Sequence, residues 1–499
     1  MTFLFLSSGL FLGWSLGAND AANVFGTAVG TKMLRFKTAA LIAGVFVIIG
    51  AVWGGGGTTH TLGKLGAVNA LAGSFTVALA AALTVFWMTR LRLPVSTSQA
   101  IVGAIIGWNI FTSSITDYNS LITIVSTWIV CPVLAAVFAM LLYTLVRFYL
   151  NRSRQHILRI DMRTRIGLIL VGAFGAYSLG ANNIANVMGV FVPASPFKEM
   201  SVLGLFTLSG SQILFLIGGL AIAVGIFTYS HKVMETVGGS LLRLSPMAAL
   251  VVVLAEALVL FLFSSEALEQ WLLTHGLPAI PLVPVSSSQA VVGAVIGIGL
   301  LKGGRGIRYR VLSEIAAGWA STPIVAGIIT FVALFFVQNV FDQKISERTE
   351  YRLSEPVIAY LQSQGIEDAN LGNWTERTFI NPLRLQSRLR KTTQLNEAQR
   401  RTVIESARIT PLYMAALIFE KDLDKEWFTS AQWQALQMTI GKTYTYEWQL
   451  FEDLQAQSAD WKFKEDTRLN KSYNKELQEK RDFLVMMFRV KPAPDEDEM

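Results

Sequence analysis

The stretch SLGANDAANVFG at residues 15–26 returns as SLGANNIANVMG at residues 178–189, and nine of the twelve positions are identical. A second pair follows in the same order. LPVSTSQAIVGAIIG at residues 93–107 is matched by VPVSSSQAVVGAVIG at residues 283–297, with eleven of fifteen positions identical. Two ordered copies of the same motifs predict a chain built from two related halves.

A fainter third pair, WIVCP at residues 128–132 and WASTP at residues 319–323, completes the repeat. The offsets between the copies are 163, 190 and 191 residues, so the order is kept and the second copy carries one insertion. We place this insertion at residues 264–283.

The composition is that of a membrane protein with an appended domain. Of the 499 residues, 52% are hydrophobic and only 15% are charged, whereas a soluble protein has roughly a quarter charged residues. Residues 1–340 hold 19 Lys/Arg and 9 Asp/Glu, against 23 and 26 in residues 341–499. We expect a first transmembrane repeat at 1–150, a second at 151–340, and a soluble helical C-terminal domain after residue 340.

Apolar stretches recur through the first 340 residues, and a membrane-spanning helix needs roughly 20 of them. Residues 94–112 and 282–301 are marginal in length and begin with a proline and a polar cluster, which predicts the return arms of re-entrant hairpins. Basic loops at 31–37, 147–165 and 302–310 are expected on the inside. Each half then crosses the membrane an odd number of times, which inverts the second half and places both termini outside. The predicted fold is an all-α polytopic membrane protein with two inverted repeats and broken helices.

Polar residues lie in the middle of the first apolar span. A carboxylate at the bilayer centre, such as Asp20, costs roughly 2.5–3.5 kcal/mol, and the neighbouring amides Asn19 and Asn23 need partners of their own. The surrounding glycines are expected to let the helix unwind locally and expose backbone groups. Packing between helices is the structural alternative, and for one copy the two interpretations are about equal. The return of the cluster in the second half favours a binding site.

The second motif offers three hydroxyls directly after a proline. Proline suits the first turn of a helix, Ser and Thr cap helix N-termini, and free backbone N–H groups there bind anions. A plain helix cap would be the better interpretation of one copy, but two copies from inverted halves would surround a tetrahedral anion with donors. The hydroxyls belong to Ser96, Thr97 and Ser98 in the first copy and to Ser286, Ser287 and Ser288 in the second.

No Lys or Arg lies inside the four motifs, so an oxyanion near a carboxylate needs a compensating cation, and Na⁺ or H⁺ is the natural source. Asn and Asp oxygens are hard ligands that Na⁺ would use. We therefore predict a cation-coupling role for Asn19, Asp20 and Asn182 and no other metal site. Hydrogen phosphate carries a proton that Asp20 could accept and sulfate does not, which favours phosphate.

These motifs resemble the signatures of the inorganic phosphate transporter (PiT) family, over about residues 1–340. GANDAANVFGTAVGTK, GANNIANVMG and the twin boxes PVSTSQ and PVSSSQ carry the resemblance. It implies cation-coupled uptake of inorganic phosphate across the cell membrane. The implied phosphate contacts are Asp20, Asn23, Asn183, Asn186, Ser96, Thr97, Ser98, Ser286, Ser287 and Ser288.

Three positions depart from the family pattern. Gln99 and Gln289 stand where many members have His, and Asn183 stands where the second copy often has Asp. A branch of the family that looks sulfate-specific also lacks the His, so a sulfate permease is the alternative function.

Other classes of protein fit less well. The sequence shows no nucleophile–base set or metal-ligand cluster, so we expect no enzyme and no cofactor. The mid-span Asp20 favours a carrier with a bound site over an anion channel. Glu256 lies in an apolar helix, and coupling and structural roles are equally weighted for it. The expected partners are phosphate and the lipid bilayer, without nucleic acid; a homodimer and the partner of the C-terminal domain are left open.

Overall fold

The computed structural model divides the chain into two compact units. The first comprises Met1–Thr112, Thr116–Glu269 and Ala279–Ser346, and the second Ser113–Ile115, Gln270–Pro278 and Glu347–Met499. Pro94, and Arg154 and Arg305 of the basic loops, lie outside the described residues. Those described are 2–66, 68–90, 95–152, 156–195, 197, 200–202, 206–231, 245–304, 308–347, 349–375, 377–421, 423, 425–465, 467 and 470–490.

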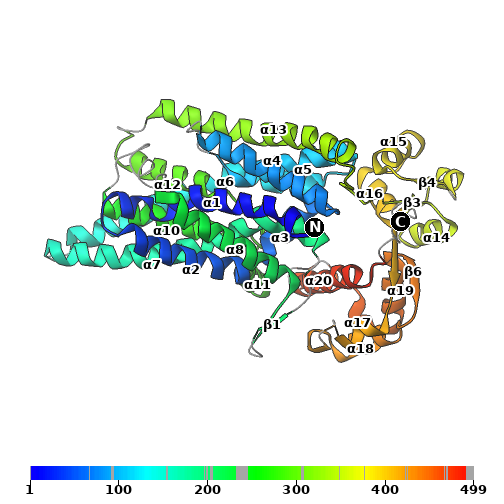
Figure 1. Ribbon diagram of the computed structural model, residues 1–499. Coiled ribbons are helices and arrows are strands. Elements are labelled where there is room, and N and C mark those ends of the chain that lie inside the picture. Colours follow the sequence, from blue (N-terminus) through cyan, green and yellow to red (C-terminus); the bar gives the residue numbers. More distant parts are fainter. Residues whose placement is uncertain are drawn as a thin grey trace. The chain divides into compact units, whose positions relative to one another are not determined.

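The first unit is a bundle of apolar helices (Figure 1). Seven of the described helices, α2, α4, α6, α7, α8, α10 and α13, are long and apolar enough to cross a membrane. This confirms the predicted all-α polytopic membrane fold. The helices of this unit are α1 (Thr2–Gly30), α2 (Phe36–Gly54), α3 (Gly56–Leu65), α4 (Leu71–Arg90), α5 (Thr97–Thr112), α6 (Tyr118–Arg152), α7 (Ile157–Met188), α8 (Gly210–Thr228), α10 (Pro246–Ser264), α12 (Ser287–Leu301) and α13 (Tyr309–Asn339), while residues of α11 (Glu266–Thr274) fall in both units.

The region before α8 is not a continuation of the apolar helix. The 3-10 helix η1 (Gly189–Ala194) follows α7, and the strands β1 (Met200–Val202) and β2 (Phe206–Leu208) then form an antiparallel hairpin. The membrane-length helix α8 therefore begins only at Gly210.

Helices α1 and α7 carry the first motif pair, and both run unbroken through it. The predicted local unwinding near Asp20 is therefore wrong. A Cβ atom at Gly17 would collide with the backbone carbonyl of Ile222 in α8, and one at Gly180 would collide with that of Val47 in α2. These glycines allow close helix crossings, and their helix stays intact.

The helical structure is interrupted instead at the start of the two hydroxyl boxes, residues 96–98 and 286–288. Val95 and Ser96 are not helical, and α5 starts only at Thr97. Helices α5 and α12 have 16 and 15 residues, which makes them shorter than full spans. The helix α11 lies inside the predicted insertion at residues 264–283. The re-entrant course of these segments and the inversion across the membrane stay predictions.

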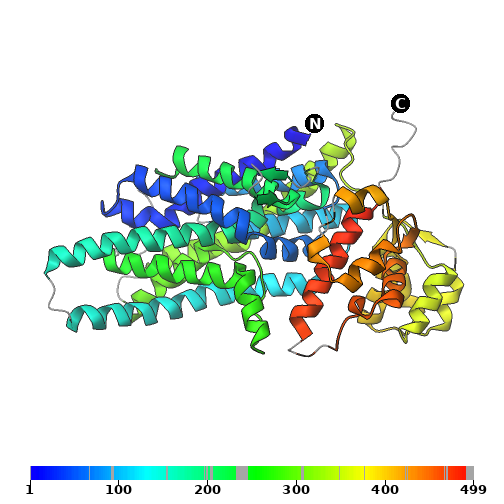
Figure 2. The same cartoon turned by 90° about the horizontal axis from the view of Figure 1, so that it is seen from below.

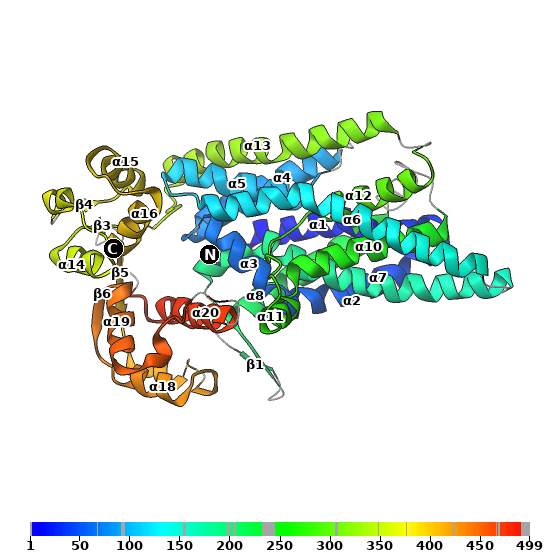
Figure 3. The same cartoon turned by 180° about the vertical axis from the view of Figure 1, so that it is seen from behind.

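Equivalent residues of the two halves make reciprocal contacts. Helix α5 packs on α13 and α12 packs on α6, while α1 packs on α8 and α7 packs on α2; Figure 3 shows α13 beside α5 and α4. A Cβ atom at Gly103 would collide with the carbonyl of Pro323, and one at Gly293 with that of Pro132. The halves thus share one apolar core, and their division near residue 150 stays a prediction.

The second unit is mainly helical, but it also contains two small antiparallel sheets, which the sequence analysis did not foresee. The strands pair as β3–β4 and β5–β6. The elements are β3 (Tyr351–Arg352), α14 (Glu355–Ser363), η2 (Ala369–Trp374), β4 (Thr378–Phe379), α15 (Pro382–Thr392), α16 (Glu397–Ala407), β5 (Ile409–Tyr413), α17 (Ala416–Lys421), η3 (Lys425–Trp427), α18 (Ser430–Gln437), β6 (Thr443–Tyr446), α19 (Glu447–Gln457), η4 (Ala459–Trp461) and α20 (Lys471–Phe488).

Two apolar clusters form the interior of this unit. One gathers residues of α14, α15 and α16, and the other gathers residues of α17, α18, α19 and α20, which are orange to red in Figure 2. Trp461 is fully buried in the second cluster. The tryptophans of the tail thus contribute to a packed interior.

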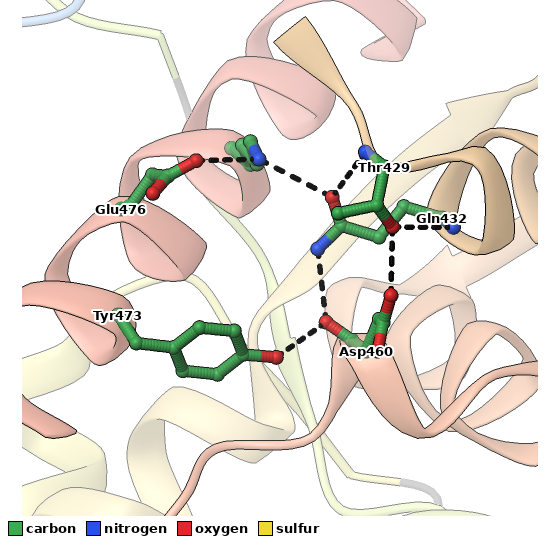
Figure 4. Close-up of polar contacts among 6 residues, drawn as sticks. Thr429, Gln432, Asp460, Tyr473 and Glu476 are labelled. Atoms are coloured by element: carbon green, nitrogen blue, oxygen red, sulfur yellow. Dashed lines mark hydrogen bonds and ion pairs between the residues drawn. The ribbon is translucent and has the colours of Figure 1, made fainter.

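A polar network ties α20 to α18 and η4 (Figure 4). The carbonyl of Asp460 accepts hydrogen bonds from Gln432 Nε2 at 2.9 Å and from the Tyr473 hydroxyl at 2.8 Å. The ammonium of Lys480, which is only 3% exposed, donates to Gln432 Oε1 at 3.2 Å and pairs with Glu476 at 2.7 Å. A buried charge requires such partners because its desolvation is costly.

The tight crossings predict that Gly293→Ala destabilises the first unit. Its methyl group meets the carbonyl of Pro132, a backbone atom that cannot rotate away, and such overpacking costs about 1–3 kcal/mol. We expect a lower unfolding temperature of the purified protein in detergent. The matched control is Gly63→Ala in α3, where no atom lies within 4 Å of the added Cβ, and the unfolding temperature should not fall. Equal melting of both variants would contradict the tight crossing.

Candidate functional site

The four repeated motifs meet in the interior of the first unit. Asn23 of α1 donates from Nδ2 to the hydroxyl of Ser287, at the start of α12, at 2.7 Å. In the reciprocal bond, Asn186 of α7 donates to the hydroxyl of Ser98 in α5 at 2.9 Å. Each asparagine therefore binds the hydroxyl box of the other half, which brings predicted site residues from distant parts of the sequence together.

The two boxes also bind each other. The hydroxyl of Ser98 donates to the carbonyl of Val285 at 3.2 Å, and the hydroxyl of Ser288 donates to the carbonyl of Val95 at 3.1 Å. These bonds hold the N-termini of α5 and α12 side by side. A helix N-terminus carries partial positive charge and free N–H groups, so the site has two of them.

Both helices are capped by the first serine of their box. Ser96 accepts a hydrogen bond from the backbone N–H of Gln99, and Ser286 accepts one from that of Gln289, each at 3.3 Å. The Thr97 hydroxyl is buried and has no hydrogen-bond partner. This donor is available to a bound molecule in the same place.

Only the first copy of the motif contributes a carboxylate to the site. Asp20 is 4% exposed, accepts from Asn19 Nδ2 at 3.0 Å and lies within hydrogen-bonding reach of the Ser287 hydroxyl. Its counterpart Asn183 is neutral, equally buried, and accepts from Asn186 at 2.9 Å. The donors of the site are therefore repeated, but the acid is not.

Asn182 holds the segment that leads into α12. Its Nδ2 donates to the carbonyl of Val285 at 2.7 Å, and its Oδ1 accepts from the backbone N–H of the same residue at 2.9 Å. The counterpart in the first half, Asn19, instead binds Asp20. Both ends of the Asn182 amide are thus engaged, and its predicted role in cation coupling stays a prediction.

Glu256 of α10 brings a second carboxylate close to the first. It is 1% exposed, neither carboxylate oxygen has a hydrogen-bond partner, and it interacts electrostatically with Asp20. LAEAL at residues 254–258 aligns with LAAAL at residues 79–83, so its counterpart is Ala81. Unpaired buried carboxylate oxygens are costly, and a bound cation or proton removes that cost.

Arg90, at the end of α4, was not among the residues predicted from the sequence. A small cavity of the first unit reaches Asn19 and is also lined by Ser15, Tyr229 and Arg90. Arg90 is exposed, and its guanidinium lies 5.1 Å from the ring centroid of Phe86. It belongs to no repeated motif, so nothing in the sequence set it apart.

No group of three His, Cys, Asp or Glu side chains that could hold a metal ion occurs in the part of the chain that the structure describes. The groups of the site that could hold a cation are its amide and hydroxyl oxygens and the carboxylates of Asp20 and Glu256.

Apolar spans that enclose a polar site made from two pairs of repeated motifs define a membrane transporter. A model of the phosphate transporter family matches residues 16–330 and 279–483, and the chain belongs to this family. The resemblance seen in the sequence is thereby confirmed. Because the family consists of permeases, the protein is a multi-pass membrane transporter and not an enzyme.

Relatives with different named substrates are similar to this chain. A Pyrococcus horikoshii protein that carries the name of a phosphate permease is 29% identical over 406 residues, covering 65% of this chain and 95% of its own. The sulfate permease CysP of Bacillus subtilis is 30% identical over 338 residues, covering 65% and 86%.

A solved structure has a similar fold. The sodium-dependent phosphate transporter matches with a TM-score of 0.56 and 22% sequence identity, over 68% of this chain and 98% of that chain.

The unequal bonding of the two equivalent asparagines gives a test. Asn182→Ala removes two hydrogen bonds to Val285 and leaves its backbone N–H without a partner, while its carbonyl keeps the bond from Ser98, so we expect a loss of about 2 kcal/mol of stability. Asn19→Ala removes one bond from a half-buried side chain and should lower the unfolding temperature much less. Thermal unfolding of both purified variants in detergent measures the difference. Equal loss in the two variants would contradict the bracing role of Asn182.

Proposed function

We propose that this protein carries inorganic phosphate across the membrane, coupled to a Na⁺ or H⁺ gradient. The observation that carries the proposal is the junction of the α5 and α12 N-termini through the Ser98–Val285 and Ser288–Val95 hydrogen bonds. Backbone N–H groups and hydroxyls at two joined helix starts suit a tetrahedral oxyanion.

The proposed contacts divide into two groups. The phosphate contacts are Asp20, Asn23, Asn183, Asn186, Ser96, Thr97, Ser98, Ser286, Ser287 and Ser288. The cation-coupling residues are Asn19, Asp20 and Asn182, and the position of Glu256 near Asp20 adds it to this group.

Asp20 favours phosphate over sulfate. A buried carboxylate beside the oxyanion repels a fully ionised anion, but it can accept a hydrogen bond from the hydroxyl of hydrogen phosphate. Sulfate is the second candidate because a sulfate permease is among the similar proteins. Gln99 and Gln289 do not titrate, so neither can supply a proton to the anion.

The cation requirement follows from the charges at the site. Asp20 and Glu256 are both buried, and no Lys or Arg lies in the four motifs. A phosphate bound there would add to uncompensated negative charge in a low-dielectric interior, which is costly. A cation bound with the phosphate offsets this charge, and the coupling of the two fluxes follows.

Uptake into proteoliposomes tests the substrate. We expect labelled phosphate to enter saturably, to depend on an imposed Na⁺ or pH gradient, and to be reduced by excess unlabelled phosphate far more than by excess sulfate. The two gradients are imposed separately, with liposomes without protein as the control. Sulfate that abolishes phosphate uptake, while phosphate fails to compete with labelled sulfate, would reverse the assignment.

Asp20→Asn tests the coupling. Asparagine is nearly isosteric, so the variant should fold and insert normally while driven uptake falls on the order of tenfold or more, because a charged hydrogen-bonding group is lost. Its counterpart Asn183 is already neutral and cannot substitute. Initial uptake rates against cation concentration, normalised to folded protein, measure the effect. An unchanged cation dependence would remove Asp20 from the coupling mechanism and direct attention to Glu256.

A further inference from the structure

The helix starts at the site carry a capping box that is only half formed. In a complete box the first residue accepts a bond from the backbone of the fourth, and the side chain of the fourth returns to the backbone N–H of the first. The boxes of α8, α16 and α18 are complete and have Gln in the fourth position. In α5 and α12 the serine half is formed. The Oε1 atoms of Gln99 and Gln289, however, are buried and have no partner.

The direction of the helix crossing shows which residue of the neighbouring helix lies level with each glutamine. A Cβ at Gly103 would meet the carbonyl of Pro323, and one at Gly107 would meet that of Gly327. Residue numbers rise together along the contact, so α5 and α13 run parallel where they cross. Residues four positions apart lie on the same face of a helix.

Gln99 and Trp319 both lie four residues before this contact, on the helix faces that meet there. The Nε1 atom of Trp319 is buried without a hydrogen-bond partner, as is the Oε1 atom of Gln99. The second half repeats the arrangement at the crossing of α12 and α6, where Gln289 and Trp128 hold the same positions and the same two atoms are unpaired. In both halves, an unpaired donor on one helix and an unpaired acceptor on the other thus lie one turn from the same crossing.

We propose that Gln99 and Gln289 are positioning residues of the oxyanion site, whose carboxamides can pair with the indole N–H groups of Trp319 and Trp128 in place of their own helix N-termini. The proposal rests on the proposed function and deepens it. When an oxyanion occupies the helix starts, each Gln carboxamide pairs with its tryptophan. Without that tryptophan, the carboxamide closes its capping box.

The reason is competition for the same backbone group. A closed box places the carboxamide oxygen on an N-terminal N–H, which is a group that an oxyanion at the helix start uses. The indole N–H offers that oxygen another partner of similar strength. One net hydrogen bond corresponds to roughly a threefold to tenfold change in an equilibrium constant, so removal of the tryptophan shifts the balance by that amount.

The test is a double-mutant cycle on the full-length protein in detergent, with equilibrium binding of labelled inorganic phosphate at one fixed Na⁺ concentration. Trp128→Phe should weaken binding roughly threefold to tenfold, because Gln289 then competes with phosphate. Gln289→Met in the Trp128→Phe background removes the competitor and should restore the affinity. Trp319→Phe and Gln99→Met provide an independent second cycle.

The matched control is Trp108→Phe. Trp108 is also buried and lies in α5, but its indole N–H donates to the carbonyl of Ile345 at 3.3 Å. This variant should melt at a lower temperature while its phosphate affinity stays normal. Melting temperatures of all variants show that affinities are compared between folded proteins.

Rescue of Trp128→Phe by Gln289→Met supports the proposal, since a merely structural role of the pair predicts two losses that do not cancel. Unchanged affinity in both Trp→Phe variants overturns it. A further loss on adding Gln→Met also overturns it, because the glutamine would then be a direct ligand. Wild-type protein that binds no phosphate is a separate result, which counts against the proposed function itself.

Discussion

The hydrogen bonds from Asn23 to Ser287 and from Asn186 to Ser98 are the constraint on which the rest of the first unit depends. An amide inside an apolar bundle must find a partner within the protein, and here each partner lies at the start of a short helix in the other half. The two halves therefore have to interlock. For the halves to interlock, α5 and α12 must approach their neighbouring helices closely, and glycines such as Gly103 allow this approach.

The sequence revealed which residues meet, because repeated polar motifs in apolar spans have few structural explanations. It could not reveal how the helices carry them. Gly17 next to a polar cluster is equally compatible with an unwound helix and with a close crossing. The choice depends on the carbonyl of Ile222, a neighbour from a distant part of the chain. The roles of Asn19 and Asn182 also differ through their surroundings, although the two residues occupy equivalent positions.

In the second unit, too, the sequence predicted some features and not others. Amphipathic runs at residues 397–409 and 474–487 predicted helices in the tail, and α16 and α20 lie at these positions. The strands escaped notice because β3, β4 and β6 have only two to four residues, which is too short for an alternating pattern to stand out. The buried Lys480 was equally invisible, since lysine in an amphipathic helix normally marks the solvent face.

The site is symmetric in its hydrogen-bond donors and asymmetric in its acids. Hydroxyls and capped helix starts occur in both halves, as suits an anion whose oxygens are equivalent. The carboxylates do not repeat, because Asp20 corresponds to Asn183 and Glu256 to Ala81. Both carboxyl groups are buried and interact with each other, so the acidic groups lie together on one side of the site. If the proposed coupling holds, a cation has one favourable position relative to the anion in such a site, and a fixed arrangement of this kind is what coupling two solutes in one carrier requires.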